Sequence, residues 1–183
     1  EPSDVDAQGR LVICENSGNN DLLRLIGRPE WNDPSASSAL FRSPDPTLQA
    51  RIVFDGVNGY RINTRNLPGG TYLIEYIFTN TVLATDTLTK VLIVNSAPKA
   101  VINVRNSCIE DVITYRDNST IPNNKSSATI NKWSWTYGEG GNGNDGVSQN
   151  PTYMYTSEGF KTLALRVTTN QGCQHDTTRV IRV

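Results

Sequence analysis

This sequence is poor in the residue types on which many catalytic and metal sites depend. Its 183 residues include one histidine, one methionine and three cysteines. One histidine and three scattered cysteines do not supply the closely spaced ligands of a zinc site. A Ser-His-Asp triad would need His175 to be held by an acid, but adjacent side chains on a strand face opposite ways, which excludes its neighbour Asp176. The sequence therefore predicts a non-catalytic chain, and we expect His175 to be a solvated turn residue.

Charge and long apolar runs are also limited. The chain has 17 Lys and Arg against 18 Asp and Glu, a formal net charge of -1. Neither half has the dense basic field that nucleic acid binding needs. No apolar run is long enough to span a membrane. The chain starts at "EPSD" without a signal peptide, so we expect a mature or excised piece of a longer protein.

What the sequence does contain is typical of β structure. The 14 glycines, 9 prolines and many Thr, Asn and Ser residues favour strands and turns over helices. Short segments with strand periodicity recur, and no helical period accompanies them. In the first half they are residues 10–14, 22–27, 50–54, 59–64, 71–79 and 86–94. In the second half they are residues 99–104, 111–117, 131–137, 151–155, 160–168 and 177–183. This pattern predicts an all-β protein of antiparallel sandwiches.

Two stretches without strand periodicity organise the chain. Residues 28–46 contain four prolines and no period, which predicts a long loop across a sheet edge. "NSAPKA", residues 95–100, ends one strand and resets the chain direction at a proline. We therefore predict two domains, residues 1–96 and residues 97–183, in series.

The second half carries an ordered set of motifs. They are "APKAVI" (97–102), "CIEDVITYRDNS" (108–119), "WSWTYGEG" (133–140), "NPTYMY" (150–155), "GFKTLALRV" (159–167) and "GC" (172–173). This set resembles the PKD domain, an immunoglobulin-like module of extracellular proteins with the motif W-x-W-D-F-G-D-G. The resemblance covers residues 97–183 and implies a PKD-like β-sandwich. The motif residues are Trp133, Trp135, Tyr137, Gly138, Gly140, Pro151, Tyr155 and Gly159.

The chain departs from the PKD pattern at three positions. Thr136 and Glu139 stand where the family has its two acids, and Tyr153 stands where it often has His. In the family those acids mostly brace the turn after the third strand, so the resemblance implies a structural turn here. PKD domains of bacterial type often carry a cysteine pair at the positions of Cys108 and Cys173, which implies a disulfide between them. Cys14 would then be a buried thiol or pair with a cysteine outside this chain.

The first half resembles a different module. "VFDGVNGYRINTRNLPGGTYLIEY", residues 53–76, is similar to a repeated Ig-like module in very large surface proteins of gliding bacteria. In those proteins the module precedes a PKD domain. They are exported by the type IX secretion system, and many are gliding adhesins or secreted degradative enzymes with stalk domains. The resemblance implies a first Ig-like sandwich ahead of the PKD-like one.

Two weaker ligand hypotheses come from loops. Glu139, Asn142, Asn144 and Asp145 offer oxygens in a glycine-rich loop that calcium prefers, but their spacing is not that of an EF-hand. A plain turn without a cofactor is the stronger interpretation. Trp31 lies in the proline-rich stretch, and an aromatic ring in a loop can stack on a sugar. The stronger interpretation is that Trp31 pins this stretch onto the sandwich.

These observations predict a non-catalytic extracellular module of a large secreted or surface protein of a bacterium, acting as an adhesive or spacer unit. The expected partners are neighbouring domains of the same protein and polysaccharide or surface ligands, without nucleic acid or membrane insertion. Two alternatives to this prediction stay open. One is the accessory region of a secreted hydrolase, and the other is a carbohydrate-binding module.

Overall fold

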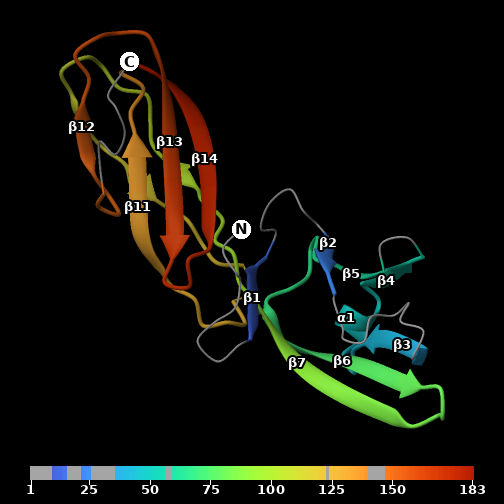
Figure 1. The fold of residues 1–183 in the computed structure, drawn as a ribbon. Helices are drawn as coiled ribbons and strands as arrows, with labels where there is room; N and C mark the ends of the chain where they lie inside the picture. Colours follow the sequence, from blue (N-terminus) through green and yellow to red (C-terminus); the bar gives the residue numbers. More distant parts are fainter. Residues whose placement is uncertain (1–9, 16–21, 26–35, 57–58, 123, 140–146) are drawn as a thin grey trace. The chain divides into compact units, whose positions relative to one another are not determined.

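A computed structural model describes residues 10–15, 22–25, 36–56, 59–122, 124–139 and 147–183. The chain divides into two compact units, Glu1–Asn95 (unit 1) and Ser96–Val183 (unit 2), each described by itself below (Figure 1). Almost all regular structure is strand, which confirms the all-β prediction. No helix in the described part of the chain is long and apolar enough to cross a membrane.

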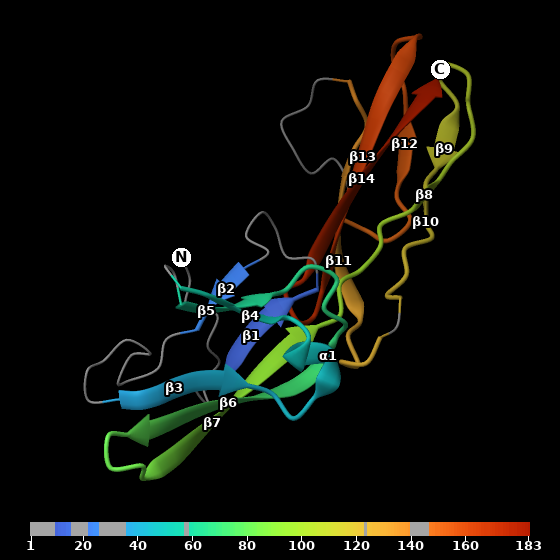
Figure 2. The same ribbon diagram turned by 90° about the vertical axis from the view of Figure 1, so that its right-hand side faces the viewer.

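Unit 1 is built from two sheets and one helical turn. Its elements are β1 (Leu11–Cys14), β2 (Leu22–Arg24), β3 (Ala36–Arg42), α1 (Pro46–Gln49), β4 (Ile52–Asp55), β5 (Gly59–Asn63), β6 (Gly70–Asn80) and β7 (Thr85–Asn95). One sheet has the order β1-β7-β6-β3 and the other the order β2-β5-β4. Figure 2 shows β3, β6 and β7 as neighbours in the first of these sheets. The strand pairs are antiparallel except β1 and β7, which are parallel.

The alternation in β6 sets the core of unit 1. Tyr72, Ile74 and Tyr76 are buried, whereas the intervening Leu73 is exposed. Period-two side chains lie on opposite faces of a sheet, so one face of β6 packs inward. The core consists of Leu48, Ile62, Leu67, Tyr72, Ile74, Leu92 and Val94.

The predicted loop over residues 28–46 is wrong for its second half. β3 pairs antiparallel with β6, and the rings of Phe41 and Tyr76 lie 4.9 Å apart. Asp45 then caps α1, because its carboxylate accepts hydrogen bonds from the backbone N–H groups of Thr47 and Leu48. The prolines mislead here because Pro46 occupies the first helical turn, where a proline is tolerated.

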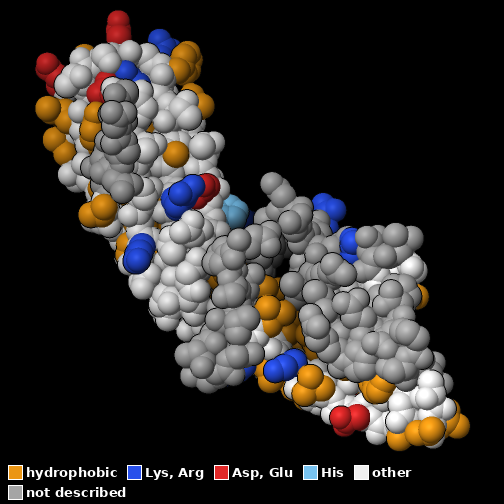
Figure 3. Space-filling model, viewed as in Figure 1, with side chains coloured by type: hydrophobic (Ala, Val, Ile, Leu, Met, Phe, Trp, Pro, Cys, Tyr) orange, Lys and Arg blue, Asp and Glu red, His pale blue; other side chains and the backbone are white. Residues whose placement is uncertain are grey.

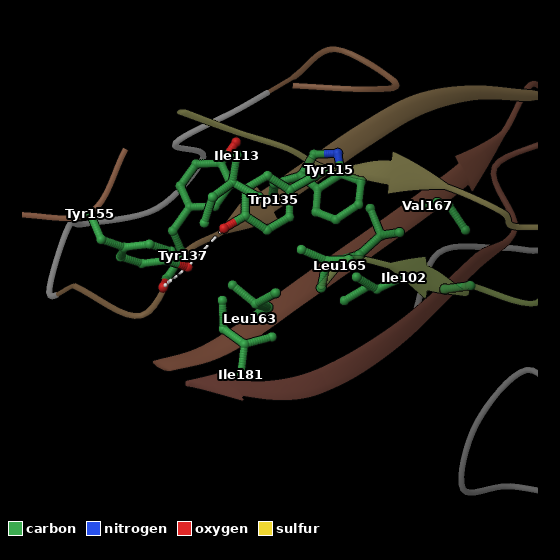
Figure 4. Packing of buried hydrophobic residues seen from close by; sticks show 12 residues of the cluster. Ile102, Ile113, Tyr115, Trp135, Tyr137, Tyr155, Leu163, Leu165, Val167 and Ile181 are labelled. Atoms are coloured by element: carbon green, nitrogen blue, oxygen red, sulfur yellow. Dashed lines mark hydrogen bonds between the residues drawn. The ribbon is translucent and has the colours of Figure 1, made fainter. Parts of the chain in front are cut away.

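Unit 2 has a three-stranded sheet and two short strand pairs. Its elements are β8 (Ile102–Asn103), β9 (Val112–Thr114), β10 (Arg116–Asp117), β11 (Ile130–Thr136), β12 (Thr152–Met154), β13 (Phe160–Thr169) and β14 (Gln174–Arg182). The three-stranded sheet has the order β11-β13-β14, and β10-β8 and β12-β9 are the pairs. Buried side chains from both parts form one core, as a sandwich requires (Figure 4). The buried residues are Ala100, Ile102, Val104, Ile113, Tyr115, Trp135, Tyr137, Tyr155, Leu163, Leu165, Val167 and Ile181.

The predicted disulfide between Cys108 and Cys173 is wrong. Cys108 is a free, exposed thiol, and the bonded cysteines are Cys14 and Cys173. Cys173 lies just before the first residue of β14, whereas Ser107 binds the carbonyl of Arg182, the last residue of that strand. Nine strand residues span about 30 Å at 3.3 Å each. Cys108 and Cys173 therefore lie near opposite ends of β14. That separation excludes a disulfide between them, because a disulfide requires Cα atoms within about 7 Å.

Candidate functional site

The turn after β11 carries a compact polar cluster. Gly138 turns the chain with a φ of +80°, and a Cβ at this position would lie 2.7 Å from the carbonyl oxygen of Thr162. A side chain is therefore excluded both by backbone conformation and by the neighbouring strand β13. This close approach places Glu139 against residues of β12, of the turn after it and of the start of β13. We call Glu139, Tyr153, Thr156, Ser157 and Lys161 the Glu139 cluster.

Both oxygens of the Glu139 carboxylate have donors. Oε1 accepts from Lys161 Nζ at 3.0 Å, from Ser157 Oγ at 2.7 Å and from the Ser157 N–H at 3.2 Å. Oε2 accepts from the Tyr153 hydroxyl at 3.0 Å and from the Thr156 N–H at 3.4 Å. The ion pair is largely enclosed, since the side chains of Lys161 and Glu139 are 9% and 11% exposed. The carboxylate thus ties the turn after β11 to the turn after β12.

This environment holds Glu139 ionised. Burial of the carboxylate by itself raises its pKa, but the hydrogen bonds from Ser157, Lys161, Tyr153 and Thr156 outweigh burial and lower the pKa to about 2. A general acid or base works best with a pKa near the operating pH. A carboxylate that stays charged throughout the neutral range and is fully engaged with donors is suited to bracing a turn.

A row of tyrosines connects the Glu139 cluster to the core. Tyr153 stacks on Tyr137 with ring centroids 4.1 Å apart. The Tyr115 hydroxyl donates to the Tyr155 hydroxyl at 3.0 Å, and the Tyr155 hydroxyl donates to the Tyr137 carbonyl at 3.0 Å (Figure 4). Burial raises the pKa of Tyr115 far above its usual value, and the Tyr155 contact adds to this. These hydroxyls therefore stay protonated and act as structural links between the two layers.

The other motif residues occupy structural positions. Trp135 and Tyr137 are fully buried, and Trp133 is half-buried with its Nε1–H donating to Asp117 at 2.7 Å. The Pro151 carbonyl accepts from the Tyr115 N–H, and Gly159, with a φ of +116°, exchanges two backbone hydrogen bonds with Val183. Gly140 lies outside the described residues.

The loop hypotheses fall mainly on residues outside the described part of the chain. Asn142, Asn144, Asp145 and Trp31 lie there, and of the calcium candidates only Glu139 is described. Its carboxylate is engaged by the donors of its cluster. Among the described residues no three His, Cys, Asp or Glu side chains group as a metal site does. The plain turn without a cofactor stays the prediction for residues 139–145, and calcium binding stays its untested alternative.

His175 is not the turn residue that the sequence suggested. It belongs to β14, and its Nδ1 accepts from the Ala100 N–H at 3.2 Å. Asp176, on the other face, forms an exposed ion pair with Arg166 at 2.6 Å. The two neighbours therefore serve different contacts. Both residues lie inside β14, so their side chains point to opposite faces of the strand, as expected.

A shallow groove of about 520 Å³ lies on another part of unit 2. It runs between the segment around β8 and the segment around β9 and β10, and its lining is largely polar. Arg105, Arg116 and Asn103 are exposed there, and Ser107 is half-buried. The exposed carboxylate of Asp111 also lines the groove. Two guanidinium groups with neighbouring amide and hydroxyl groups offer hydrogen-bond donors to an anionic ligand.

Residues 95–183 match the family model of the PKD domain. Unit 2 is a PKD domain. The PKD1 domain of Vibrio anguillarum Epp is 24% identical over 49% of this chain and 95% of its own, with a TM-score of 0.41. The PKD1 domain of the Vibrio cholerae metalloprotease PrtV is 23% identical over 48% of this chain and 96% of its own, with a TM-score of 0.40.

A structure of carbohydrate-binding modules from the β-sandwich superfamily is 29% identical to this chain. The match covers 49% of this chain and 35% of that one, with a TM-score of 0.43. No curated protein matches the chain.

Sequence reasoning missed three members of the Glu139 cluster in the PKD domain, Thr156, Ser157 and Lys161. Lys161 was detectable, because it occupies the same alternating set as the buried Leu163, Leu165 and Val167. A lysine at an inward position of a strand is rarely buried without a partner, so it pointed to an acid nearby. Thr156 and Ser157 lie in a turn and gave no comparable signal.

Proposed function

We propose that this chain is a non-catalytic, extracellular-type module that serves as an adhesive or spacer unit of a larger exported or surface protein. The observation that carries the proposal is the match of residues 95–183 to the PKD domain family, preceded by a second strand-rich unit. PKD domains are typically non-catalytic modules. The neighbouring domains of the same protein are then its permanent partners.

The Glu139 cluster supports this proposal. It is the most enclosed ion pair among the described residues, and its charged and hydroxyl groups are directed at each other. Together with the tyrosine links between the two layers, it braces the PKD domain at the turns that follow β11 and β12. A spacer benefits from such internal bracing, since it must keep its fold while linking other domains.

The resemblance of residues 53–76 to an Ig-like repeat extends the proposal. We place the chain in a large surface protein of the gliding-adhesin type, exported by a type IX system and exposed to the cell exterior. The disulfide between Cys14 and Cys173 is compatible with an oxidising location, because disulfides persist outside the cytoplasm. An accessory position beside a hydrolase domain is the alternative arrangement.

The groove with Arg105 and Arg116 favours a second candidate, a binding module for acidic polysaccharide. Uronic acid or sulfate groups on a glycan would accept hydrogen bonds from the two guanidinium groups. The adhesive form of the proposal would then use this groove for contact.

The test combines a turnover screen with a binding screen. The purified 183-residue chain is incubated with polysaccharides and peptides, and then titrated with neutral and acidic glycans. We expect no turnover in any reaction. Reproducible hydrolysis that a single substitution abolishes would overturn the non-catalytic assignment.

Binding results separate the adhesive, carbohydrate-binding and spacer forms. Saturable binding to an acidic glycan that is lost in Arg105→Ser/Arg116→Ser, and retained in a Lys125→Ser control, assigns adhesion to the groove. Saturable binding that is lost in Trp31→Ala instead assigns it to the proline-rich stretch. An absence of glycan binding favours the spacer. Protease treatment of intact cells, followed by detection of the chain, tests exposure at the cell surface.

A further inference from the structure

Among the described residues, the hairpin of β6 and β7 has one strand edge that no other strand covers. β7 pairs with β6 along Thr85–Val94, but β1 covers the other side of β7 only at Leu92–Asn95. No described strand pairs with residues 85–90 on that side. An open edge over these residues presents backbone donors and acceptors that another strand can use.

The hydrogen bonds show which residues face this open edge. The Asn95 carbonyl accepts from Glu15, which follows β1, whereas the Ala84 carbonyl accepts from Asn80 on the β6 side. The backbone N–H and C=O groups of successive residues in a strand point alternately to its two sides. Those of Thr85, Thr87, Thr89 and Val91 therefore point away from β6. The Thr87 N–H agrees with this, because it donates to the side chain of its neighbour Asp86 at 2.8 Å and not to a strand.

We propose that a second copy of this chain docks on this edge, with the two β7 strands antiparallel about a two-fold axis at Leu88. Pairing residues 86–90 of one copy with the same residues of the other puts residue 86 opposite 90, and 87 opposite 89. β1 of each copy limits the paired length. The bond from the Glu15 N–H to the Asn95 carbonyl repeats every two residues along β1, so the Leu11 N–H is directed at the Val91 carbonyl and the edge is blocked from Val91 onward. The outward-facing residues meet outward-facing residues, as an antiparallel ladder requires.

The side chains are complementary in the same register. Asp86 of each copy lies opposite Lys90 of the other, so the two-fold axis produces two such pairs. Leu88 of one copy lies opposite Leu88 of the other. All three residues are exposed, and across the strand pair they face the apolar Phe78, Tyr76 and Ile74 of β6. Neither Asp86 nor Lys90 has an ion pair within the described residues. Opposite charges directly across an antiparallel pair are stabilising, and like charges are destabilising.

The exposed surface at this hairpin fits an interface. Leu88 is 55% exposed, and at the hairpin tip Val82 and Leu83 are 79% and 75% exposed. Figure 3 shows hydrophobic side chains reaching the surface at this end of unit 1, at the lower right of the view. The tip of one copy would lie beside the start of β1 in the other, since that is where the paired segment ends. The product is one continuous sheet through both copies, a homophilic contact that goes beyond the proposed spacer or adhesive function.

The experiment exchanges the charges at residues 86 and 90. An interface of one strand pair is small and belongs to the weakly associating interfaces, so self-association is measured by sedimentation at protein concentrations of about 10 µM to 1 mM. Asp86→Lys places Lys opposite Lys, and Lys90→Asp places Asp opposite Asp, so each variant alone should lose self-association by at least about tenfold. Asp86→Lys/Lys90→Asp restores opposite charges and should restore association. An equimolar mixture of the two single variants should form heterodimers. Lys125→Asp, a charge change on unit 2, should associate as the unaltered chain does.

Cysteine cross-linking tests the two-fold axis. In a Cys108→Ser background, Leu88→Cys should form a disulfide dimer rapidly, because residue 88 lies opposite itself. Thr87→Cys should not, because its opposite residue is Thr89. A chain that stays monomeric at about 1 mM, single variants that associate normally, or equal cross-linking at residues 87 and 88 would each overturn the proposal. So would association that appears only after removal of residues 1–9, since the chain before β1 would then occupy this edge itself.

Discussion

Replacement of Glu139 by glutamine removes the charge of the Glu139 cluster and nearly preserves its shape. The amide group of glutamine has one acceptor oxygen, and its nitrogen is a donor. In one orientation the nitrogen would face the donors Ser157 and Lys161, and in the other it would face the donors Tyr153 and Thr156. The Lys161 ammonium, whose side chain is 9% exposed, would lose its counter-ion. We therefore expect Glu139→Gln to destabilise the PKD domain.

The magnitude can be approached in two ways. Removal of one partner of a buried ion pair costs about 3–5 kcal/mol in well-enclosed cases. Thr156 and Ser157 are exposed, so solvent screens part of this interaction, and we expect about 2–3 kcal/mol. A carboxyl whose pKa falls from 4.5 to about 2 on folding gives a similar value, on the order of 3 kcal/mol.

The pH dependence has a defined sign. The folded pKa of Glu139 lies below the unfolded value, so its contribution is complete above about pH 4.5 and is lost as the pH falls toward 2. The difference in unfolding free energy between the unaltered chain and Glu139→Gln should therefore be largest near neutral pH. It should shrink as the pH is lowered to about 3.

Urea denaturation followed by tryptophan fluorescence measures this difference. A Trp31→Phe background leaves Trp133 and Trp135 as the only tryptophans, and both lie in the PKD domain. Glu158→Gln is the matched control, because Glu158 is exposed and adjacent to the cluster, and it should change stability by less than about 0.5 kcal/mol. The reasoning fails if Glu139→Gln is as mild as the control near neutral pH, or if its effect is the same at low pH.

Three further predictions use the same chain. Trp135→Ala should cost about 3–5 kcal/mol because the ring is fully buried, and urea denaturation should show a far smaller cost for Trp31→Ala; the reverse order would contradict the assigned core. Gly138→Ala should cost at least about 2 kcal/mol by the same assay, because its φ is positive and its Cβ would contact the backbone of Thr162; a neutral effect would refute the close approach. Alkylation of the folded chain without reductant should label Cys108 alone, and mass spectrometry of labelled peptides should find the other two cysteines modified only after reduction.

Much of the strand pattern was predictable from local periodicity. Alternation in Leu163, Leu165 and Val167 reports a buried face directly, because successive side chains point to opposite sides of a strand. The same alternation occurs in β6, where Tyr72, Ile74 and Tyr76 form the buried face, but the pattern did not say which of its two faces is buried. β3 was missed because the prolines around it are helix and turn signals, while its place in the sheet depends on pairing with β6.

The cysteine pairing and the Glu139 cluster depend on long-range contacts. The disulfide prediction placed Cys108 and Cys173 at one end of the sandwich. In the structure, Ser107 is bonded to Arg182 at the end of β14, whereas Cys173 precedes the start of the same strand. Glu139 and Tyr153 both depart from the PKD pattern, and the structure brings them into contact at 3.0 Å. The domain boundary at residue 96 stays a prediction, and the calcium hypothesis stays an untested alternative.

The placement of β14 also bears on how the PKD domain would respond to tension. Ala100, near the start of the domain, binds His175 at the beginning of β14, whereas Val183 follows the other end of the strand and binds Gly159. A pulling force applied between residues 96 and 183 would therefore run along β14. It would act on the bonds between the strand and its neighbours in shear, so that many bonds must break together and not one after another. The side-chain bond from Arg179 to the Ile102 carbonyl and the backbone bond from Ser107 to Arg182 share that load. If the domain serves as the proposed spacer of a surface protein, this geometry favours mechanical resistance over easy extension.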